Sequence, residues 1–194
     1  MKGKAARRLY HALGGCVLPM LALVLTREAL LLFVGFVAAI FVLGEALRLS
    51  VPSLNRRLMS LFSGMSSSFK ETEAAKPIGT TYLIVGSFLT FVLFPRDVAV
   101  TALFFAAVGD PAAAECGERF GRLRIGKKSV EGTVAFLVSS LLVGGILLWA
   151  GLQINWVAVV VGALLAALIE LVPIPVNDNV AAPLVSAAAM RLTL

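Results

Sequence analysis

Residues 108–133 read VGDPAAAECGERFGRLRIGKKSVEGT and form a polar centre in a chain of which only 14% of the residues are charged. An acid in a membrane segment is energetically costly and therefore often marks a functional site. Carboxylates bind divalent cations, and clustered bases bind phosphates. We therefore expect a site for a metal ion and phosphate groups at a membrane edge. Asp110 follows the twelve uncharged residues 98–109, and the bases after it are Arg119, Arg122, Arg124, Lys127 and Lys128.

The composition predicts an all-α polytopic membrane protein. The 194 residues are 59% hydrophobic, the mean hydropathy is +0.95, and uncharged stretches of nearly twenty residues recur, which is not typical of a soluble domain. The two cysteines, Cys16 and Cys116, support neither a disulfide framework nor a cysteine-based metal site. A single histidine, His11, excludes a site built from several histidines.

The apolar runs predict about seven transmembrane helices in a single domain, residues 1–194. The run 98–109 covers only about 18 Å at a rise of 1.5 Å per residue, whereas the hydrocarbon core is roughly 30 Å thick. This helix must therefore continue through Asp110 and Pro111 toward Gly117 or beyond. The expected spans are 10–26, 29–49, 78–94, 98 to at least 117, 134–152, 156–171 and 180–194.

Two features of the region after the second span are informative. Glu45 lies near the end of that span and is expected either to reach the interface or to face a polar site. After it, apolar residues at helical spacing from Leu54 to Phe62, with Ser53 as N-cap, predict a short helix in the membrane interface. The composition of residues 63–77 is typical of a mobile linker.

The distribution of basic residues predicts the orientation. The N-terminal tail holds four Lys and Arg residues, the segment from Arg48 to Lys76 five, and the central stretch five, which accounts for 14 of the 17. The positive-inside rule then places the N-terminus on the cytoplasmic side of the cell membrane, and the active site is expected to face the cytoplasm. The expected cytoplasmic polar segments are 1–9, 50–77, 110–132 and 172–179.

The central stretch also contains small residues at helical spacing. Asp110, Ala114, Gly117 and Gly121 fall on one face of a helix. Such a face is equally typical of a helix-packing seam and of a ligand groove, and the acid at its head favours the groove.

The segment 121–129, GRLRIGKKS, is a near match to the P-loop pattern. Lys128 stands where a metal-binding hydroxyl is required and no strand precedes it, so we reject that reading. Glycines that expose backbone N–H groups, followed by two lysines, are still suited to phosphate oxygens. An ordinary positive-inside loop remains the alternative.

Together the motifs resemble the CTP-dependent lipid kinases, the group that contains dolichol kinase, phytol kinase and the yeast-type CTP-dependent diacylglycerol kinase. The string GDPAAAECGERFGRLRIGKKSVEGT is similar to the core signature of that group. Three more strings agree with it: RRLYHALGG (7–15), KPIGTTY (76–82) and IELVPIPVNDNVAAP (169–183). The resemblance covers residues 7 to about 189.

The resemblance implies roles for individual positions. Asp110 matches the essential acidic position of the family, and Arg7 and Arg8 match its basic pair, although Lys is common where Arg8 stands. The chain holds little beyond the shared domain, so the resemblance does not identify the lipid. The remaining matches are Gly117 and Gly121 beside the acid, and Gly126, Lys127, Lys128, Ser129, Glu131 and Gly132 in the glycine-lysine-glutamate segment.

Phosphoryl transfer requires a divalent ion, cationic groups on the phosphate oxygens and an alcohol held in line. We expect Asp110, Glu131 and Asp178 to act at the catalytic centre and to ligate Mg²⁺. The candidates for the general base are Asp178, Glu170 and His11. The expected nucleotide- and phosphate-binding residues are Arg7, Arg8, Lys76, Gly117, Gly121, Gly126, Lys127, Lys128, Ser129 and Gly132.

The resemblance implies a kinase that transfers the γ-phosphate of CTP to a long-chain lipid alcohol such as a polyprenol, phytol or diacylglycerol. The expected partners are CTP, the lipid alcohol and the bilayer, without nucleic acid; the oligomeric state is not predicted. One alternative is a cytidylyltransferase that makes a CDP-lipid from a lipid phosphate and releases pyrophosphate. A small transporter is a further alternative, but it would place functional acids on both sides of the membrane.

Overall fold

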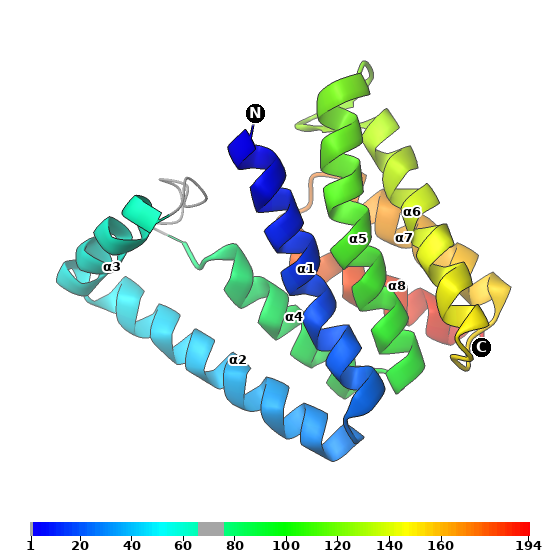
Figure 1. Cartoon of the computed structure of the whole chain (residues 1–194), viewed down its shortest axis with the longest axis horizontal. Coiled ribbons are helices and arrows are strands. Elements are labelled where there is room, and N and C mark those ends of the chain that lie inside the picture. The colour runs from blue at the N-terminus through cyan, green and yellow to red at the C-terminus, as the bar shows by residue number, and fades with distance from the viewer. Residues whose placement is uncertain (1, 66–75) are drawn as a thin grey trace.

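A computed structural model describes the backbone of residues 2–65 and 76–194, and the side chains of residues 12–58 and 76–194. In this part of the chain the fold is all-helical except for one small hairpin, which confirms that the protein is all-α (Figure 1). The helices are α1 (Lys2–Val24), α2 (Arg27–Ser50), α3 (Pro52–Met65), α4 (Gly79–Leu93), α5 (Arg96–Phe120), α6 (Val130–Trp149), α7 (Trp156–Leu171) and α8 (Asp178–Leu192), and the strands are β1 (Arg124–Ile125) and β2 (Lys128–Ser129).

Helix α5 is the central element of the bundle and packs against α1, α4, α6, α7 and α8. Its first half is buried on almost every side, as expected for a helix enclosed by others. The helix runs without interruption through Asp110 and Pro111 to Phe120, so its 25 residues extend about 37 Å. The predicted continuation of the fourth span is therefore confirmed.

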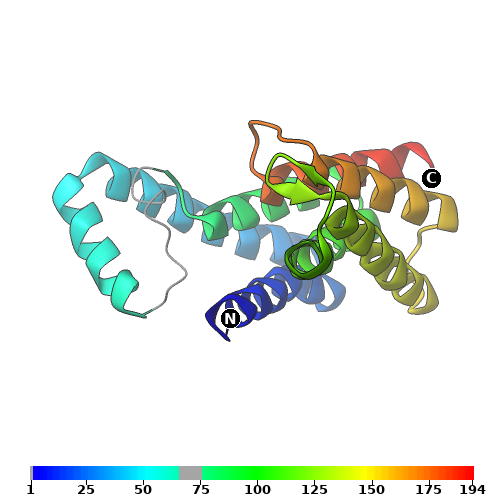
Figure 2. The same cartoon turned by 90° about the horizontal axis from the view of Figure 1, so that it is seen from above.

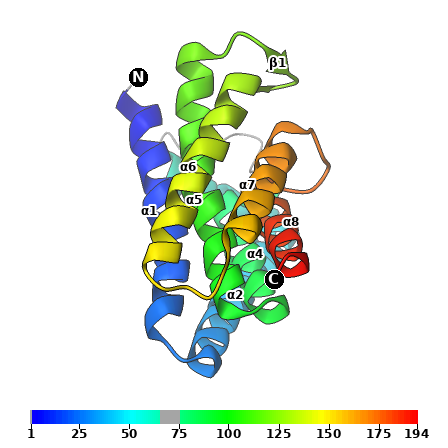
Figure 3. The same cartoon turned by 90° about the vertical axis from the view of Figure 1, so that its right-hand side faces the viewer.

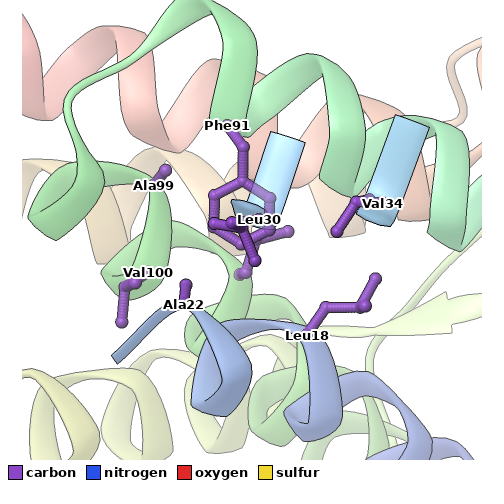
Figure 4. Packing of buried hydrophobic residues seen from close by; sticks show 8 residues of the cluster. Leu18, Ala22, Leu30, Val34, Phe91, Ala99 and Val100 are labelled. Atoms are coloured by element: carbon purple, nitrogen blue, oxygen red, sulfur yellow. The ribbon is translucent and has the colours of Figure 1, made fainter. Parts of the chain in front are cut away.

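Two apolar clusters lie on different sides of α5. The first joins α5 to α1, α2 and α4 around the ring of Phe91 (Figure 4). The second joins α5 to α7 and α8 around Phe105 and Met190, both fully buried. The first cluster consists of Leu18, Ala22, Leu30, Val34, Phe91, Ala99, Val100 and Leu103.

Helices α2 and α3 extend away from the bundle, and α3 lies at the distant end of α2 (Figures 1 and 2). Their junction is held by the Arg48 guanidinium, which is 3% exposed and donates to Glu45 Oε2 at 2.6 Å. Arg48 also donates to Asn55 Oδ1 (2.8 Å) and to the backbone carbonyl of Lys76 (2.7 Å). Of the two expected positions for Glu45, the structure therefore shows the polar site.

The start of α1 and the hairpin lie at the same end of the bundle, whereas the turn between α4 and α5 lies at the other (Figures 1 and 3). At that second end, Arg27 donates to the backbone carbonyls of Phe91, Val92 and Phe94 at 3.3–3.4 Å. A cation at the C-terminus of a helix satisfies carbonyls that have no partner in the helix. Arg27 thus fixes the start of α2 on the end of α4.

Among the described residues, three helices, α2, α5 and α6, are long and apolar enough to cross a membrane. Residues 12–24 of α1 and the helices α4 and α7 are apolar but shorter. The 15 or 16 residues of α4, α7 and α8 extend only about 22–24 Å, less than a typical hydrocarbon core. The three long helices agree with the predicted spans, while the other four remain predictions.

Several predicted boundaries differ from the structure. Helix α1 begins at Lys2, so the basic tail 1–9 is helical from its second residue rather than a separate polar segment. Helix α3 exists as predicted but begins at Pro52, before the expected N-cap Ser53, because proline fits the first helical position. Most of the predicted linker, residues 66–75, lies outside the described residues.

The contact between α4 and α8 provides a test of this packing. A Cβ atom added at Gly86 would lie 2.3 Å from the Asn179 backbone oxygen and 3.0 Å from Val180 Cα. Gly86→Ala should therefore destabilise the protein by about 1–3 kcal/mol, although alanine is the better helix former. Thermal unfolding in detergent measures this loss.

The matched control for Gly86 is Gly44→Ala, at a helical glycine with no atom within 4 Å of the added Cβ. This variant should unfold at or above the wild-type temperature. Equal melting temperatures for Gly86→Ala and the wild type would show that α4 and α8 are not in close contact.

Candidate functional site

Lys128 connects three parts of the chain that are far apart in sequence. Its ammonium is bound to Glu170 Oε1 in the last turn of α7 and lies 3.1 Å from Asp178 Oδ2 at the start of α8. Lys128 itself belongs to β2, in the hairpin that follows α5 (Figure 3). The side chain thus attaches the hairpin to the polar end of the α7–α8 pair. We call the three carboxylates near this ammonium, Glu170, Asp178 and Asp110, the carboxylate cluster. Asp110 is included because its charge acts on Lys128.

The two carboxylates that contact Lys128 differ in burial. The Glu170 side chain is only 4% exposed, that of Asp178 is 43% exposed, and both share the one ammonium of Lys128. Partial burial lowers the pKa of Lys128, but the hydrogen bond and charge of Glu170, with the charges of Asp178 and Asp110, outweigh burial and raise it. Lys128 therefore remains protonated at neutral pH.

The turn between α7 and α8 sets the position of Asp178. The Asn177 side chain caps α8 by accepting the backbone N–H of Asn179 at 3.0 Å, which places Asp178 in the first turn. The Asn179 amide in turn donates to the Gly79 carbonyl at the start of α4 (3.3 Å). This contact joins the segment KPIGTTY to the segment that carries Asp178.

The hairpin separates the two lysines. Arg124 pairs with Ser129 and Ile125 with Lys128, so the two-residue turn consists of Gly126 and Lys127. Gly126 has φ +61°, and glycine at the first position of such a turn is typical of type II′. Lys127 is exposed at the tip, whereas Lys128 points to the carboxylate cluster. The two residues therefore have different environments although they are adjacent.

Ser129 lies at the close contact between α5 and α6. It caps α6 by accepting the Gly132 N–H at 3.1 Å. Added Cβ atoms at Gly117 and Gly121 would lie 2.7 and 2.9 Å from the Ser129 side chain, and one at Gly132 would lie 2.7 Å from the Ala113 carbonyl. These three glycines, which we had expected to bind phosphate, allow the helix contact in this structure.

The face of α5 that contacts α6 differs from the predicted face by part of a turn. Gly109 and Ala113 face Phe136 and Gly132 of α6, while Ala114, which we had expected in the seam, is exposed. Gly117 and Gly121 lie on the predicted face and also take part in the observed contact, next to Ser129. The packing seam is therefore present, and Gly109 and Ala113, rather than the predicted Ala114, line it beside Gly117 and Gly121.

Glu131 lies in the first turn of α6 and has backbone partners. Its Oε1 accepts the N–H groups of Arg122 (3.0 Å) and Leu123 (3.2 Å). Its Oε2 is buried without a hydrogen-bond partner among the described residues. Glu131 thus binds the start of the hairpin, and the structure gives it no hydrogen bond to the carboxylate cluster.

The donors for a metal ion are fewer than predicted. In residues 12–58 and 76–194, no three Asp, Glu, His or Cys side chains are grouped so that they could hold a metal ion. Mg²⁺ is usually held by one or two protein carboxylates together with substrate phosphates. Asp110 and Asp178, both near Lys128, can supply two carboxylates, so they fit a Mg²⁺ ion that arrives with a nucleotide.

The remaining predicted site residues are Arg7, Arg8, His11 and Lys76. The side chains of Arg7, Arg8 and His11 lie outside the described residues. Lys76 is exposed, and its contact is made by the backbone carbonyl that Arg48 binds. Glu170 was predicted as one candidate for the general base, and Asn179 only as part of the string IELVPIPVNDNVAAP. The contacts of Glu170 with Lys128 and of Asn179 with Gly79 were not predicted.

The comparisons with known proteins give one relative. No family model matches the chain, and no solved structure matches it. The chain is similar to an uncharacterised protein of Rickettsia prowazekii (strain Madrid E), RP860, with 23% identity over 181 residues. The alignment covers 92% of this chain and 88% of that protein. The similarity therefore extends over nearly the whole of both chains.

Proposed function

We propose that this protein is an integral-membrane lipid kinase that transfers the γ-phosphate of CTP to a long-chain lipid alcohol. The observation that carries the proposal is the contact of Lys128 with Glu170 and Asp178. Together with the hydrogen bond from Asn179 to Gly79, it brings together three of the four strings that resemble the CTP-dependent lipid kinases. Residues that resemble one active site but lie far apart in sequence thus meet at one place.

The proposed roles follow from charge and exposure. Lys127, exposed at the hairpin tip, binds phosphate oxygens of the nucleotide, and Lys128 stabilises negative charge beside Glu170. Asp110 and Asp178 would hold a Mg²⁺ ion, and that ion would supply positive charge beside the transferred phosphoryl group. Among the candidates for the general base, Asp178 is more accessible to an alcohol than Glu170, because its side chain is 43% exposed and that of Glu170 only 4%.

The membrane setting is supported by the exposed apolar side chains as well as by helix length. Helix α2 alone exposes Leu32, Phe36 and Leu43 by more than 60% of their surface, which would be unfavourable in water. We propose that α1, α4, α7 and α8 also cross the membrane, giving seven spans, and that α3 lies in the interface. Shorter helices can be accommodated by local thinning of the bilayer.

The direct test is an assay of the purified protein in detergent with CTP or ATP, Mg²⁺ and a panel of polyprenol, phytol and diacylglycerol acceptors. Release of CDP supports the kinase, release of pyrophosphate supports a cytidylyltransferase, and neither product would favour a transporter. The phosphorylated acceptor identifies the lipid class.

Asp110→Asn should lower turnover by about 100-fold or more, because the charge that binds the metal ion is lost while size and most hydrogen bonding are kept. The melting temperature should change little. CDP release and thermal unfolding, measured on the same preparation, test both statements.

Asp97→Asn is the matched control for Asp110→Asn. Asp97 lies in the same helix at the opposite end, where its carboxylate accepts the Gln153 N–H at 2.6 Å. This variant should keep its turnover. If Asp110→Asn retains wild-type turnover, Asp110 has no part in the reaction.

The two lysines should respond differently to substitution. Lys127→Ala should raise the KM for CTP by roughly tenfold, because a charge-assisted phosphate contact is lost, without lowering stability. Lys128→Ala should also lower the melting temperature, because it leaves Glu170 buried without its partner. Kinetics and unfolding curves of both variants provide the measurement, and identical behaviour would contradict the separate roles.

The orientation can be tested with single cysteines in a background that lacks Cys16 and Cys116. Arg124→Cys in the hairpin should react with impermeant thiol reagents only from the cytoplasmic side, and Arg96→Cys only from the other side. Both positions are exposed and lie at opposite ends of the α5 region. Labelling of both from one side would contradict the proposed topology.

A further inference from the structure

Glu131 makes its contacts with the backbone of the segment that enters the hairpin. Helix α5 ends with the Gly121 N–H bound to the Gly117 carbonyl at 3.2 Å. The next two N–H groups, of Arg122 and Leu123, no longer point into the helix, and both donate to Glu131 Oε1. One carboxylate oxygen thus satisfies two backbone donors eight and nine residues earlier in the chain.

The second side of the hairpin is fixed independently. The Val130 N–H donates to the Leu123 carbonyl (2.9 Å), which extends the strand pairing down to the base of the hairpin. Ser129, directly after Lys128, is held between the cap of α6 and the glycines of α5. The incoming strand is held by its backbone pairing and, among the described side chains, by the hydrogen bonds to Glu131.

The position of the hairpin determines where the two lysines lie. Because Ile125 is paired with Lys128, a displacement of the incoming strand would move the ammonium away from Glu170 and Asp178. Lys127, at the tip, would move with it. Glu131 therefore acts on the lysines through the backbone.

We propose that Glu131 is a positioning residue that fixes the hairpin carrying Lys127 and Lys128, and that it does not ligate the metal ion. Its Oε1 is occupied by two N–H donors and its Oε2 is buried, so neither oxygen is presented to a nucleotide-bound cation. The proposal rests on the proposed kinase function for its kinetic consequence only. Its structural consequence can be tested without any activity.

The structural test compares Glu131→Gln with Glu131→Ala by limited trypsin digestion of the detergent-solubilised full chain. Glutamine keeps a carbonyl oxygen that can accept both N–H groups, whereas alanine does not. Glu131→Ala should be cleaved after Arg122 and Arg124 several times faster than wild type, and Glu131→Gln at close to the wild-type rate. Equal rates for Glu131→Ala and wild type, or for Glu131→Ala and Glu131→Gln, would overturn the proposal.

Glu115→Ala is the control for loss of a carboxylate near the hairpin. Glu115 is paired with Arg119 at 2.5 Å on the surface of α5, and its side chain is 37% exposed. Its removal should leave cleavage at Arg122 and Arg124 unchanged. Melting temperatures of all three variants separate local opening of the hairpin from global unfolding.

The kinetic test separates positioning from metal binding. A positioning residue predicts that Glu131→Gln keeps the turnover and Mg²⁺ dependence of the wild type, while Glu131→Ala raises the KM for CTP roughly tenfold. A metal ligand predicts that Glu131→Gln loses turnover, and that result would overturn the proposal. If the wild type releases no CDP, the kinase function fails, but the digestion still decides the role of Glu131.

Discussion

The bond between the Lys128 ammonium and the nearly buried Glu170 carboxylate is the contact on which the polar end of the molecule depends. A buried carboxylate without a partner is strongly destabilising, so the hairpin, α7 and α8 are stable in this arrangement only together. Asp178 shares the same ammonium without being buried to the same extent. The cluster therefore contains one buried carboxylate with a structural role, Glu170, and one carboxylate that is exposed enough to contact other groups, Asp178.

The hairpin can reach Glu170 because α5 and α6 approach each other closely just below it. Gly109, Gly117 and Gly132 leave no room for side chains at the contact, and larger residues there would separate the helices. The same glycines make Ser129 part of the helix interface. The small residues of the central stretch thus set the position of Lys128 through the helix contact.

The helices could be predicted from the sequence because long apolar runs have few alternatives in a membrane. The continuation of α5 through Pro111 followed from the length needed to span the hydrocarbon core. The rotation of α5 could not be predicted, since Ala114 and Ala113 have the same side chain, and only contact with Phe136 and Gly132 of α6 decides which one is buried.

The sequence predicted which residues belong to the candidate site better than it predicted the contacts that these residues make. Asp110 was identified as an acid that a membrane segment would not carry without need, and Lys128 and Asp178 through the family resemblance. The structure brings the charges of all three close to one another. Glu131 was given the same role because a carboxylate has the same chemistry wherever it stands. Its actual partners are backbone N–H groups, which every residue has, so no sequence pattern distinguishes them.

A short segment connects the projecting helices to the carboxylate cluster. Arg48, buried with Glu45, holds the carbonyl of Lys76, and three residues later the carbonyl of Gly79 accepts from Asn179, the neighbour of Asp178. An arginine in this position cannot easily release its acceptors, because a buried guanidinium without them is very costly. The residues between Lys76 and Gly79 are therefore held at both ends. The first turn of α8, and with it Asp178, thus has a second support in addition to Lys128.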